Sequence, residues 1–274
     1  MKFGTSYAAL LDSEIAKSGL LRPIKWFLRP FKNLFESFYV GWLEINGPFI
    51  FPKQFDRKTR LQFLLGIYEP ETAAVFKRYL TKGMTVLDIG ANFGYYTWLA
   101  SGLVGEQGSV LSFEPEPANY ELLEANIKRW NKDNIVLFEK AVSEHVGHAV
   151  LQVSGKGGCH SLVAKANSTG REIEVDTVSV DALAEEERLD RVDFIKIDIE
   201  GAELLAFKGM KKTIEQFSPV IIFELNPGFQ SQAGYSTDKL ISFLKALDYS
   251  ITYLEDEREL ERKGYLNVLA SKAT

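Results

Sequence analysis

The stretch VLDIGANFGYYTWLA, residues 86–100, predicts a strand, a glycine turn and a helix in that order. Its apolar run stops at Asp88, and helix-forming residues follow Gly94. A helix that starts after such a turn offers free backbone N–H groups and the positive end of its dipole to a ligand. Glycine permits both the sharp turn and a close approach of the ligand to the backbone. We therefore expect a nucleotide-type cofactor at this turn.

The spacing of the glycines favours a cofactor without phosphates. Gly90 and Gly94 give G-x-x-x-G, whereas dinucleotide sites carry G-x-G-x-x-G. Asn92 stands where a middle glycine would leave space for a pyrophosphate, and its side chain would crowd that group. The turn can meet a carboxylate with its N–H groups, and Asp88 can help to hold an ammonium group. The predicted cofactor-binding residues here are Asp88, Gly90, Ala91, Asn92 and Gly94.

An acid at the end of the next predicted strand suits a ribose. Glu114 follows Gly90 by 114 − 90 = 24 positions, close to the roughly 20 expected for an acid that grips a ribose diol. A carboxylate accepts hydrogen bonds from both hydroxyls and disfavours a 2′-phosphate. By analogy with such sites, we expect an adenine between Val142, in EKAVSEH, and a side chain near Glu114.

Composition narrows the classes of protein. The 274 residues, 46% hydrophobic and 25% charged, suit one large soluble α/β domain with an extension. The net charge of −5 argues against a nucleic-acid partner held by phosphate contacts. The single cysteine, Cys159, excludes an intrachain disulfide. No apolar run reaches the roughly 18–20 residues of a membrane span, and Asp12 and Glu14 stand where a signal peptide needs an apolar core. We expect a cytoplasmic protein.

Residues 1–70 are predicted to be an extension made of helices and a hairpin. Residues 15–40 carry apolar side chains at helical spacing, five basic residues, and Pro30, which should break the segment into two short helices. This amphipathic segment can lie on an anionic membrane surface, here the inner membrane. Alternatively, it packs on the following domain or on a second copy in a homodimer. Asn46-Gly47 in VGWLEINGPFIF indicates a hairpin turn.

Residues 71–274 alternate strands and helices, which predicts an α/β domain with a mostly parallel seven-stranded sheet and helices on both faces. Between the third and fourth of these strands, HAVLQVS and REIEVDTVSV predict an antiparallel insertion. Helices are expected to begin near Gly94, Ala118, Ala202, Met210 and Thr237. The expected strands are Thr85–Ile89, Ser109–Glu114, Ile135–Ala141, Asp193–Asp198, Val220–Leu225, Ser250–Leu254 and Leu266–Ser271.

Six blocks of sequence, in order, carry a resemblance to a known family. They are VLDIGANFGYYT, SFEPEP, EKAVS, VDTVSVDAL, DFIKIDIEGAE and IIFEL. Together they resemble the FkbM family of S-adenosylmethionine-dependent methyltransferases over about residues 68–225, starting at YEP. The resemblance implies a class I methyltransferase (Rossmann-like) fold and S-adenosylmethionine as the cofactor. It also implies methyl transfer to a hydroxyl, often on a sugar, a polyketide or a similar small molecule, without indicating which one.

The segment FIKIDIEGAE predicts the reacting centre. Lys196, Asp198 and Glu200 alternate with isoleucines, so they should share one side of an extended strand. A buried parallel strand is normally apolar throughout, so charges belong at its carboxyl end, where the cleft opens. Because an alcohol is a weak nucleophile, a base must take its proton during methyl transfer. The candidate bases are Asp198, Glu200 and His160, with Asp198 beside the cofactor and Glu200 on the acceptor side.

Three further residues are candidates for the acceptor site. His160 lies in the glycine-rich loop GKGGCHSL, which can cover an acceptor. Glu224 and Asn226 follow the fifth strand in FELNPGF, and Asn226 either orients the acceptor or forms the turn before Pro227. Asp198, Glu200 and Glu224 can converge as oxygen ligands, but three acids alone do not make a metal site, and we predict none.

Two other functions compete with methyl transfer. A nicotinamide oxidoreductase shares the strand, turn and acid, but Asn92 and the lack of an obvious Tyr-x-x-x-Lys pair at the cleft disfavour it. A cofactor-binding scaffold without catalysis is disfavoured because the polar residues of both segments are intact. The sequence therefore predicts a methyltransferase acting on a small-molecule or glycan hydroxyl.

Overall fold

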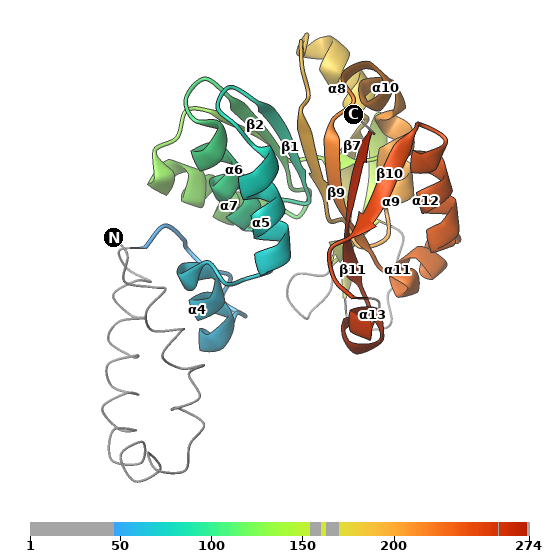
Figure 1. Ribbon diagram of the computed structural model, residues 1–274. Coiled ribbons are helices and arrows are strands. Elements are labelled where there is room, and N and C mark those ends of the chain that lie inside the picture. Colours follow the sequence, from blue (N-terminus) through green and yellow to red (C-terminus); the bar gives the residue numbers. More distant parts are fainter. Residues whose placement is uncertain (1–46, 154–159, 163–169, 257, 273–274) are drawn as a thin grey trace, which may run out of the picture. The chain divides into compact units, whose positions relative to one another are not determined.

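The computed structural model describes residues 47–153, 160–162, 170–256 and 258–272 (Figure 1). The chain divides into two compact units. The first runs to Phe49 and resumes over Asp56–Tyr68, and the second holds Ile50–Phe55 and Glu69–Thr274. In the first unit, α4 (Arg57–Leu65) begins at Asp56, whose carboxylate accepts a hydrogen bond from the Thr59 amide at 2.7 Å. This hydrogen bond is an ordinary N-cap. It satisfies one of the backbone N–H groups that have no partner within the first turn of the helix.

The second unit is built on a seven-stranded sheet, as predicted. Five strands run in the same direction as β1, and β11 alone runs opposite to them, because it is antiparallel to both β9 and β10. The predicted α/β fold with a mostly parallel seven-stranded sheet is therefore confirmed. In sheet order the strands are β3 (Ile135–Phe138), β2 (Ser109–Phe113), β1 (Thr85–Ile89), β8 (Phe194–Ile197), β9 (Val220–Leu225), β11 (Leu266–Lys272) and β10 (Tyr249–Tyr253).

Helices cover both faces of this sheet (Figure 1). On one face lie α5 (Pro70–Tyr79), α6 (Tyr95–Val104) and α7 (Pro117–Trp130); on the other lie α9 (Glu203–Gly209), α10 (Lys211–Phe217) and α12 (Thr237–Lys245). Phe76 of α5 meets Phe194 of β8 at 4.9 Å between ring centroids. On the opposite face, Leu87 and Ile195 belong to the core that also holds Phe207. Three shorter helices complete the unit: α8 (Val180–Glu186), α11 (Pro227–Gln232) and α13 (Arg258–Lys263).

The alternation of side chains places the polar residues of the sheet on the α5–α6 face. Leu87, Ile89, Ile195 and Ile197 all belong to the core on the α9 face. Asp88 and Lys196 stand between them in sequence and therefore point the other way. In β9, Phe223 and Leu225 belong to the same core, so Glu224 also points to the α5–α6 face. The charged residues of three strands thus share one side.

A second sheet follows β3, in the order β4 (Ala141–Val142), β7 (Arg171–Val178), β5 (Gly147–Val153) and β6 (His160–Ser161). The predicted antiparallel insertion is present, with β5 antiparallel to β7 and β6. The predicted single strand Ile135–Ala141 is wrong, because residues 135–138 pair with β2 and residues 141–142 pair with β7. Ala141 packs with Leu151 and Val175 in a small separate core. Because of this packing, the chain leaves the large sheet before Ala141.

The predicted N-terminal features fall largely outside the described residues. These include the amphipathic segment, residues 15–40, and the first half of the predicted hairpin. The described second half, residues 47–51, contains no strand. None of the helices in the described part of the chain has both the length and the apolar character that crossing a bilayer requires.

Candidate active site

The glycine turn after β1 packs closely against the ends of the two adjacent strands, β2 and β8. The amides of Gly90 and Ala91 both donate to the Phe113 carbonyl oxygen, at 3.0 and 2.9 Å. Gly90 has φ 79°, and a Cβ there would lie 2.0 Å from the Asp198 carbonyl oxygen. A side chain at Gly90 would therefore clash with the backbone at the end of β8. Only glycine suits this position, in both its φ angle and its space.

The far end of the turn is equally close-packed. Gly94 precedes α6 with φ 98°, and a Cβ there would lie 2.3 Å from Cδ1 of Leu123. Asn92 adopts a left-handed backbone with φ 52°, and its side-chain oxygen accepts from the Phe93 amide at 2.8 Å. The Asn126 side chain of α7 donates to the Phe93 carbonyl at 2.9 Å. Helix α7 therefore fixes the shape of the turn that we expect to hold the cofactor.

Glu114, immediately after β2, is fastened to this turn. Its carboxylate accepts from the Asn92 amide at 2.8 Å and from the Glu116 amide at 3.0 Å. The side chain is only 4% exposed. Burial raises the pKa of the Glu114 carboxyl to about 7, although both backbone hydrogen bonds oppose the rise. The predicted ribose acid, Glu114, therefore changes its charge state near neutral pH.

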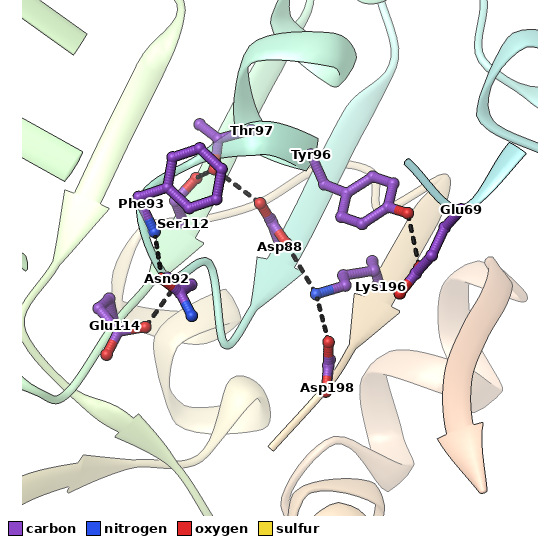
Figure 2. Close-up of polar contacts among 10 residues, drawn as sticks. All are labelled: Glu69, Asp88, Asn92, Phe93, Tyr96, Thr97, Ser112, Glu114, Lys196 and Asp198. Carbon is purple, nitrogen blue, oxygen red and sulfur yellow. Dashed lines mark hydrogen bonds and ion pairs between the residues drawn. The ribbon is translucent and has the colours of Figure 1, made fainter. Parts of the chain in front are cut away.

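Asp88 lies at the centre of a buried polar group (Figure 2). The Thr97 hydroxyl donates to Asp88 Oδ2 at 2.6 Å and lies 3.0 Å from the Ser112 hydroxyl. The other oxygen, Oδ1, is buried without a hydrogen-bond partner among the residues that the structure describes. Burial raises the pKa of Asp88, while Lys196 and Thr97 oppose the rise. A buried acceptor atom in this position is ready for a ligand donor or an ordered water.

Lys196 lies between two carboxylates (Figure 2). Its ammonium is 3.3 Å from Asp198 Oδ2, 4.0 Å from Asp88 Oδ1 and 5.1 Å from the centre of the Tyr96 ring. Burial lowers the pKa of Lys196, but the charges of Asp198 and Asp88 outweigh it and leave the pKa above its ordinary value. The ammonium is therefore charged, and it forms an ion pair with the Asp198 carboxylate, whose side chain is 38% exposed.

Glu69 also belongs to this site, although the sequence pattern does not indicate it. It precedes Pro70 at the start of α5, in a left-handed backbone conformation with φ 39°. Its carboxylate accepts a hydrogen bond from the Tyr96 hydroxyl at 2.7 Å (Figure 2). The motif YEP marks a helix start, but the fold alone brings residue 69 beside residues of α6.

The predicted alternation of Lys196, Asp198 and Glu200 on one strand holds only in part. Strand β8 ends at Ile197, and Glu200 has a left-handed backbone with φ 53° inside the following turn. The reason is Gly201, which packs so closely on α11 that a Cβ would lie 2.9 Å from the Phe229 carbonyl oxygen. The Glu200 carbonyl accepts from the Ser161 hydroxyl at 2.6 Å, which ties β6 of the insertion to this turn.

Glu224 and Asn226 lie together at the end of β9. The Asn226 side-chain amide donates to Glu224 at 3.2 Å, and its oxygen caps α11 by accepting from the Phe229 amide at 3.3 Å. Asn226 therefore forms the turn that was one of its two predicted roles. Burial, followed by the charges of Asp198 and Glu200, raises the pKa of Glu224 to about 10. Glu224 is thus protonated at neutral pH and can donate a hydrogen bond.

The remaining predicted residues stand apart from this group. Val142 lies in β4, is 2% exposed and belongs to the main apolar core. The backbone of His160 pairs with Val153, while its side chain lies outside the described part of the structure. Among the described side chains, no three of His, Cys, Asp or Glu are grouped so that they could hold a metal ion.

These features fit S-adenosylmethionine. The turn leaves its backbone free of side chains at Gly90, and beside it stands the Glu114 carboxylate, which has the chemistry to accept from a diol. Asp88 and Asp198 supply negative charge for a cofactor that carries a sulfonium and an ammonium group. The structure therefore brings together Asp88, Asn92, Glu114 and Asp198 at the carboxyl ends of neighbouring strands, where α/β sheets bind ligands.

Comparison with known proteins identifies related chains. The model of the methyltransferase FkbM domain matches residues 88–251, more than half of the chain. A hexuronic acid methyltransferase, AglP, from Haloferax volcanii is 26% identical over 174 residues, which cover 63% of this chain and 66% of the archaeal protein, just under two thirds. Methyltransferase 1 from Beauveria bassiana is 25% identical over 175 residues, covering 57% of this chain and 69% of the fungal protein.

A solved structure shares the fold. The putative rRNA methylase from Clostridium thermocellum has a TM-score of 0.51 at 14% identity, over 75% of this chain and 95% of that one. At this identity the likeness concerns the arrangement of strands and helices alone. It agrees with the predicted class I methyltransferase (Rossmann-like) fold.

Proposed function

Because the chain belongs to the FkbM family of methyltransferases, we propose that it transfers a methyl group from S-adenosylmethionine to a hydroxyl of a small molecule, sugar or glycan. The family matches the resemblance found in the sequence, and S-adenosylmethionine is its cofactor. The observation that carries the proposed reaction is the position of Asp198. Its carboxylate lies at the end of β8, partly exposed and held by the buried Lys196 ammonium.

Each cofactor-binding residue has a role that its surroundings support. The amides of the turn already donate within the protein, so the amides at the start of α6 are the ones proposed to meet the methionine carboxylate. Asp88 favours the ammonium, and Glu114 accepts from the ribose hydroxyls. Val142 remains the proposed neighbour of the adenine. When bound, the cofactor supplies an electrophilic methyl group on a positively charged sulfur.

The chain's own task is to position the acceptor and remove its proton. The alcohol oxygen must stand about 3 Å from the methyl carbon, in line with the sulfur. Asp198 and Glu200 are the proposed bases, together with His160 from the insertion. Glu224 is unsuited as a base at neutral pH because it keeps its proton, but it can bind the acceptor by donating a hydrogen bond, with Asn226 beside it.

A sugar is the acceptor that we favour. The Haloferax volcanii relative is a hexuronic acid methyltransferase, which supports a sugar as the acceptor for this chain. The polar side chains at this end of the sheet include Asp198, Glu224 and Asn226, which suit the many hydroxyls of a sugar because hydroxyls both donate and accept hydrogen bonds.

A nicotinamide oxidoreductase is the second candidate and is less well supported. Tyr235 and Lys239 do have the Tyr-x-x-x-Lys spacing. However, the Tyr235 hydroxyl lies within 2.9 and 3.0 Å of the Gly201 carbonyl and the Glu203 carboxylate, which hold it in the α11 region. For the N-terminal segment, residues 15–40, we propose either peripheral contact with the inner membrane surface of a cytoplasmic protein or pairing in a homodimer.

Calorimetry and mass spectrometry together test this proposal. We expect S-adenosylmethionine to bind and NAD to bind far more weakly. Incubation with the labelled cofactor and a panel of glycosides should then give products that carry one extra methyl group. Tight NAD binding without binding of S-adenosylmethionine would contradict the proposal, as would methyl transfer confined to nitrogen or carbon atoms.

A further inference from the structure

The turn that carries the two proposed carboxylate bases is held in two different ways. Asp198, at its start, still belongs to the sheet, because its amide donates to the Ile89 carbonyl oxygen at 3.0 Å. Glu200 lies beyond the last residue of β8, and its left-handed backbone, with φ 53°, is one that residues other than glycine rarely adopt. Such a conformation persists only where the surrounding structure fixes it. The position of Glu200 therefore depends on what contacts this part of the turn.

Three side chains form hydrogen bonds with the backbone of residues 200 and 201. The Ser161 hydroxyl, from β6 of the insertion, donates to the Glu200 carbonyl oxygen at 2.6 Å. The Tyr235 hydroxyl donates to the Gly201 carbonyl oxygen at 2.9 Å, and the Glu203 carboxylate accepts from the Gly201 amide at 3.0 Å. Ser161 and Glu203 are buried, where a hydrogen bond is stronger than in water. The turn beyond Asp198 is thus fixed by side chains from other elements.

The end of the insertion that carries Ser161 has a second attachment. Strand β6 pairs with β5 at Val153, and Val153 also pairs with Arg171 of β7. Arg171 forms an ion pair at 3.0 Å with the buried Glu116 carboxylate, and the Glu116 amide donates to Glu114. This end of the insertion is therefore tied at two points, Arg171 and Ser161, to the part of the chain that carries the candidate active site.

We propose that Ser161 and Tyr235 are positioning residues, which fix the turn that presents Glu200 to the acceptor, while the sheet itself places Asp198. This inference rests on the proposed methylation of a hydroxyl, in which Glu200 is the candidate base on the acceptor side. It gives the insertion a part in the reaction, through the hydrogen bond from Ser161. Because Asp198 has its own support, loss of either hydroxyl should affect turnover more than binding of S-adenosylmethionine.

The experiment removes the two hydroxyl groups one at a time from the full-length protein, with a glycoside that the unaltered protein methylates as the acceptor. Ser161→Ala and Tyr235→Phe should each lower kcat by about tenfold or more, because a small displacement of a reacting group suffices for such a loss. The KM for the acceptor should change less than kcat. Binding of S-adenosylmethionine, measured by calorimetry, should stay close to that of the unaltered protein. An unchanged kcat in either variant overturns the role of that residue.

Two matched variants separate positioning from a general loss of stability. Ser101→Ala removes a buried hydroxyl that donates to Asn134 at 2.7 Å, and Tyr249→Phe removes one that donates to the Pro219 carbonyl at 2.8 Å. Asn134 and Pro219 immediately precede β3 and β9, so both lie at the edge of the sheet opposite the carboxyl ends of these strands. Both control variants should lose thermal stability but keep kcat. An equal fall of kcat in the controls overturns the inference.

Double variants show through which carboxylate Ser161 acts. Ser161→Ala should lower kcat little further in a Glu200→Gln protein, whereas its full effect should persist in an Asp198→Asn protein, because only residues that act together depart from additivity. Equal effects in both backgrounds overturn the inference, while continued methylation of the glycoside leaves the proposed function intact. If the unaltered protein binds S-adenosylmethionine but methylates no glycoside, the proposed function fails, and this inference fails with it.

Discussion

The Glu114 carboxylate accepts a hydrogen bond from the Asn92 amide at 2.8 Å. This contact joins the acid after β2 to the glycine turn after β1, so the two elements expected to recognise the cofactor are bonded to each other. The turn is also held by Phe113, whose carbonyl accepts from two of its amides. We infer that the cofactor site is largely formed before the cofactor binds.

The ionisation of Glu114 should control cofactor affinity. Its pKa of about 7 means that the acid is partly protonated below neutral pH and ionised above it. The ionised form accepts from both ribose hydroxyls, so affinity for S-adenosylmethionine should rise with pH through about 7 and then level off. Glu114→Gln should weaken binding by about tenfold or more, because hydrogen bonds to a charged group contribute about 1.5–3 kcal/mol.

Titration calorimetry at several pH values checks this. The Glu114→Gln protein should show little of the rise near pH 7, while Glu124→Gln should follow the unaltered chain. An undiminished affinity in Glu114→Gln would remove Glu114 from the ribose site.

Gly90→Ala should destabilise the fold through contact with Asp198. The added Cβ would lie 2.0 Å from the backbone oxygen of Asp198, which cannot swing away as a side chain can. Gly83→Ala is the matched control, because Gly83 has φ 82° and its nearest neighbour would be 4.0 Å from a Cβ. Both variants place alanine at a positive φ, so the backbone strain should be similar. The overpacking should therefore lower the free energy of unfolding by about a further 1–3 kcal/mol in Gly90→Ala. Equal losses in denaturant unfolding would show that Gly90 is not tightly packed.

Lys196→Met should destabilise the protein by about 3–5 kcal/mol, the usual result of removing one partner from a buried ion pair. The loss should be larger at pH 8 than at pH 5. Burial raises the pKa of Asp88, so its carboxylate is protonated at a higher pH than that of an exposed aspartate. Protonation removes the negative charge that Lys196 no longer compensates in the variant. Lys196→Arg keeps the positive charge and should recover most of the stability. Thermal unfolding at the two pH values measures this, and a pH-independent loss would contradict the ion-pair role.

Asp198→Asn and Glu200→Gln test the proposed base. Each should lower kcat by about 100-fold or more if that residue removes the acceptor proton, with a smaller change in KM for the acceptor. Asp198→Asn should also weaken cofactor binding, because we propose that the Asp198 carboxylate lies beside the sulfonium. Steady-state kinetics with a methylated acceptor separates the two residues. Full turnover in both variants would exclude both carboxylates as the base and would leave His160 as the remaining candidate.

The sheet and the cofactor turn were largely predictable from sequence. The bounds of β1 and β9 are the predicted ones, and the helices near Gly94 and Thr237 begin where expected. Apolar runs that end at polar residues, followed by glycine or a cap, are local signals, and a buried parallel strand produces them clearly. The same reasoning placed Asp88, Glu114 and Asp198 at the ends of neighbouring strands.

The acceptor side was not predictable in this way, because it depends on contacts between distant segments. Glu69 meets Tyr96 only because α5 packs on α6, and Asn267 pairs with Glu224 only because β11 runs antiparallel to β9. The strand predicted through Ala141 failed because a second sheet takes up residues 141–142. Likewise, the alternation at Glu200 stopped at a turn that is set by the packing of Gly201 on Phe229.

The most direct test of the proposed reaction is the chemical nature of the methylated product. The protein is incubated with S-adenosylmethionine labelled in its methyl group and with the glycoside panel, and the product is treated with alkali. We predict a sugar that retains its label, because a methyl ether withstands alkali. Label released by alkali would reveal a methyl ester, and label on a nitrogen or carbon atom, or no transfer at all, would equally contradict hydroxyl methylation by this chain.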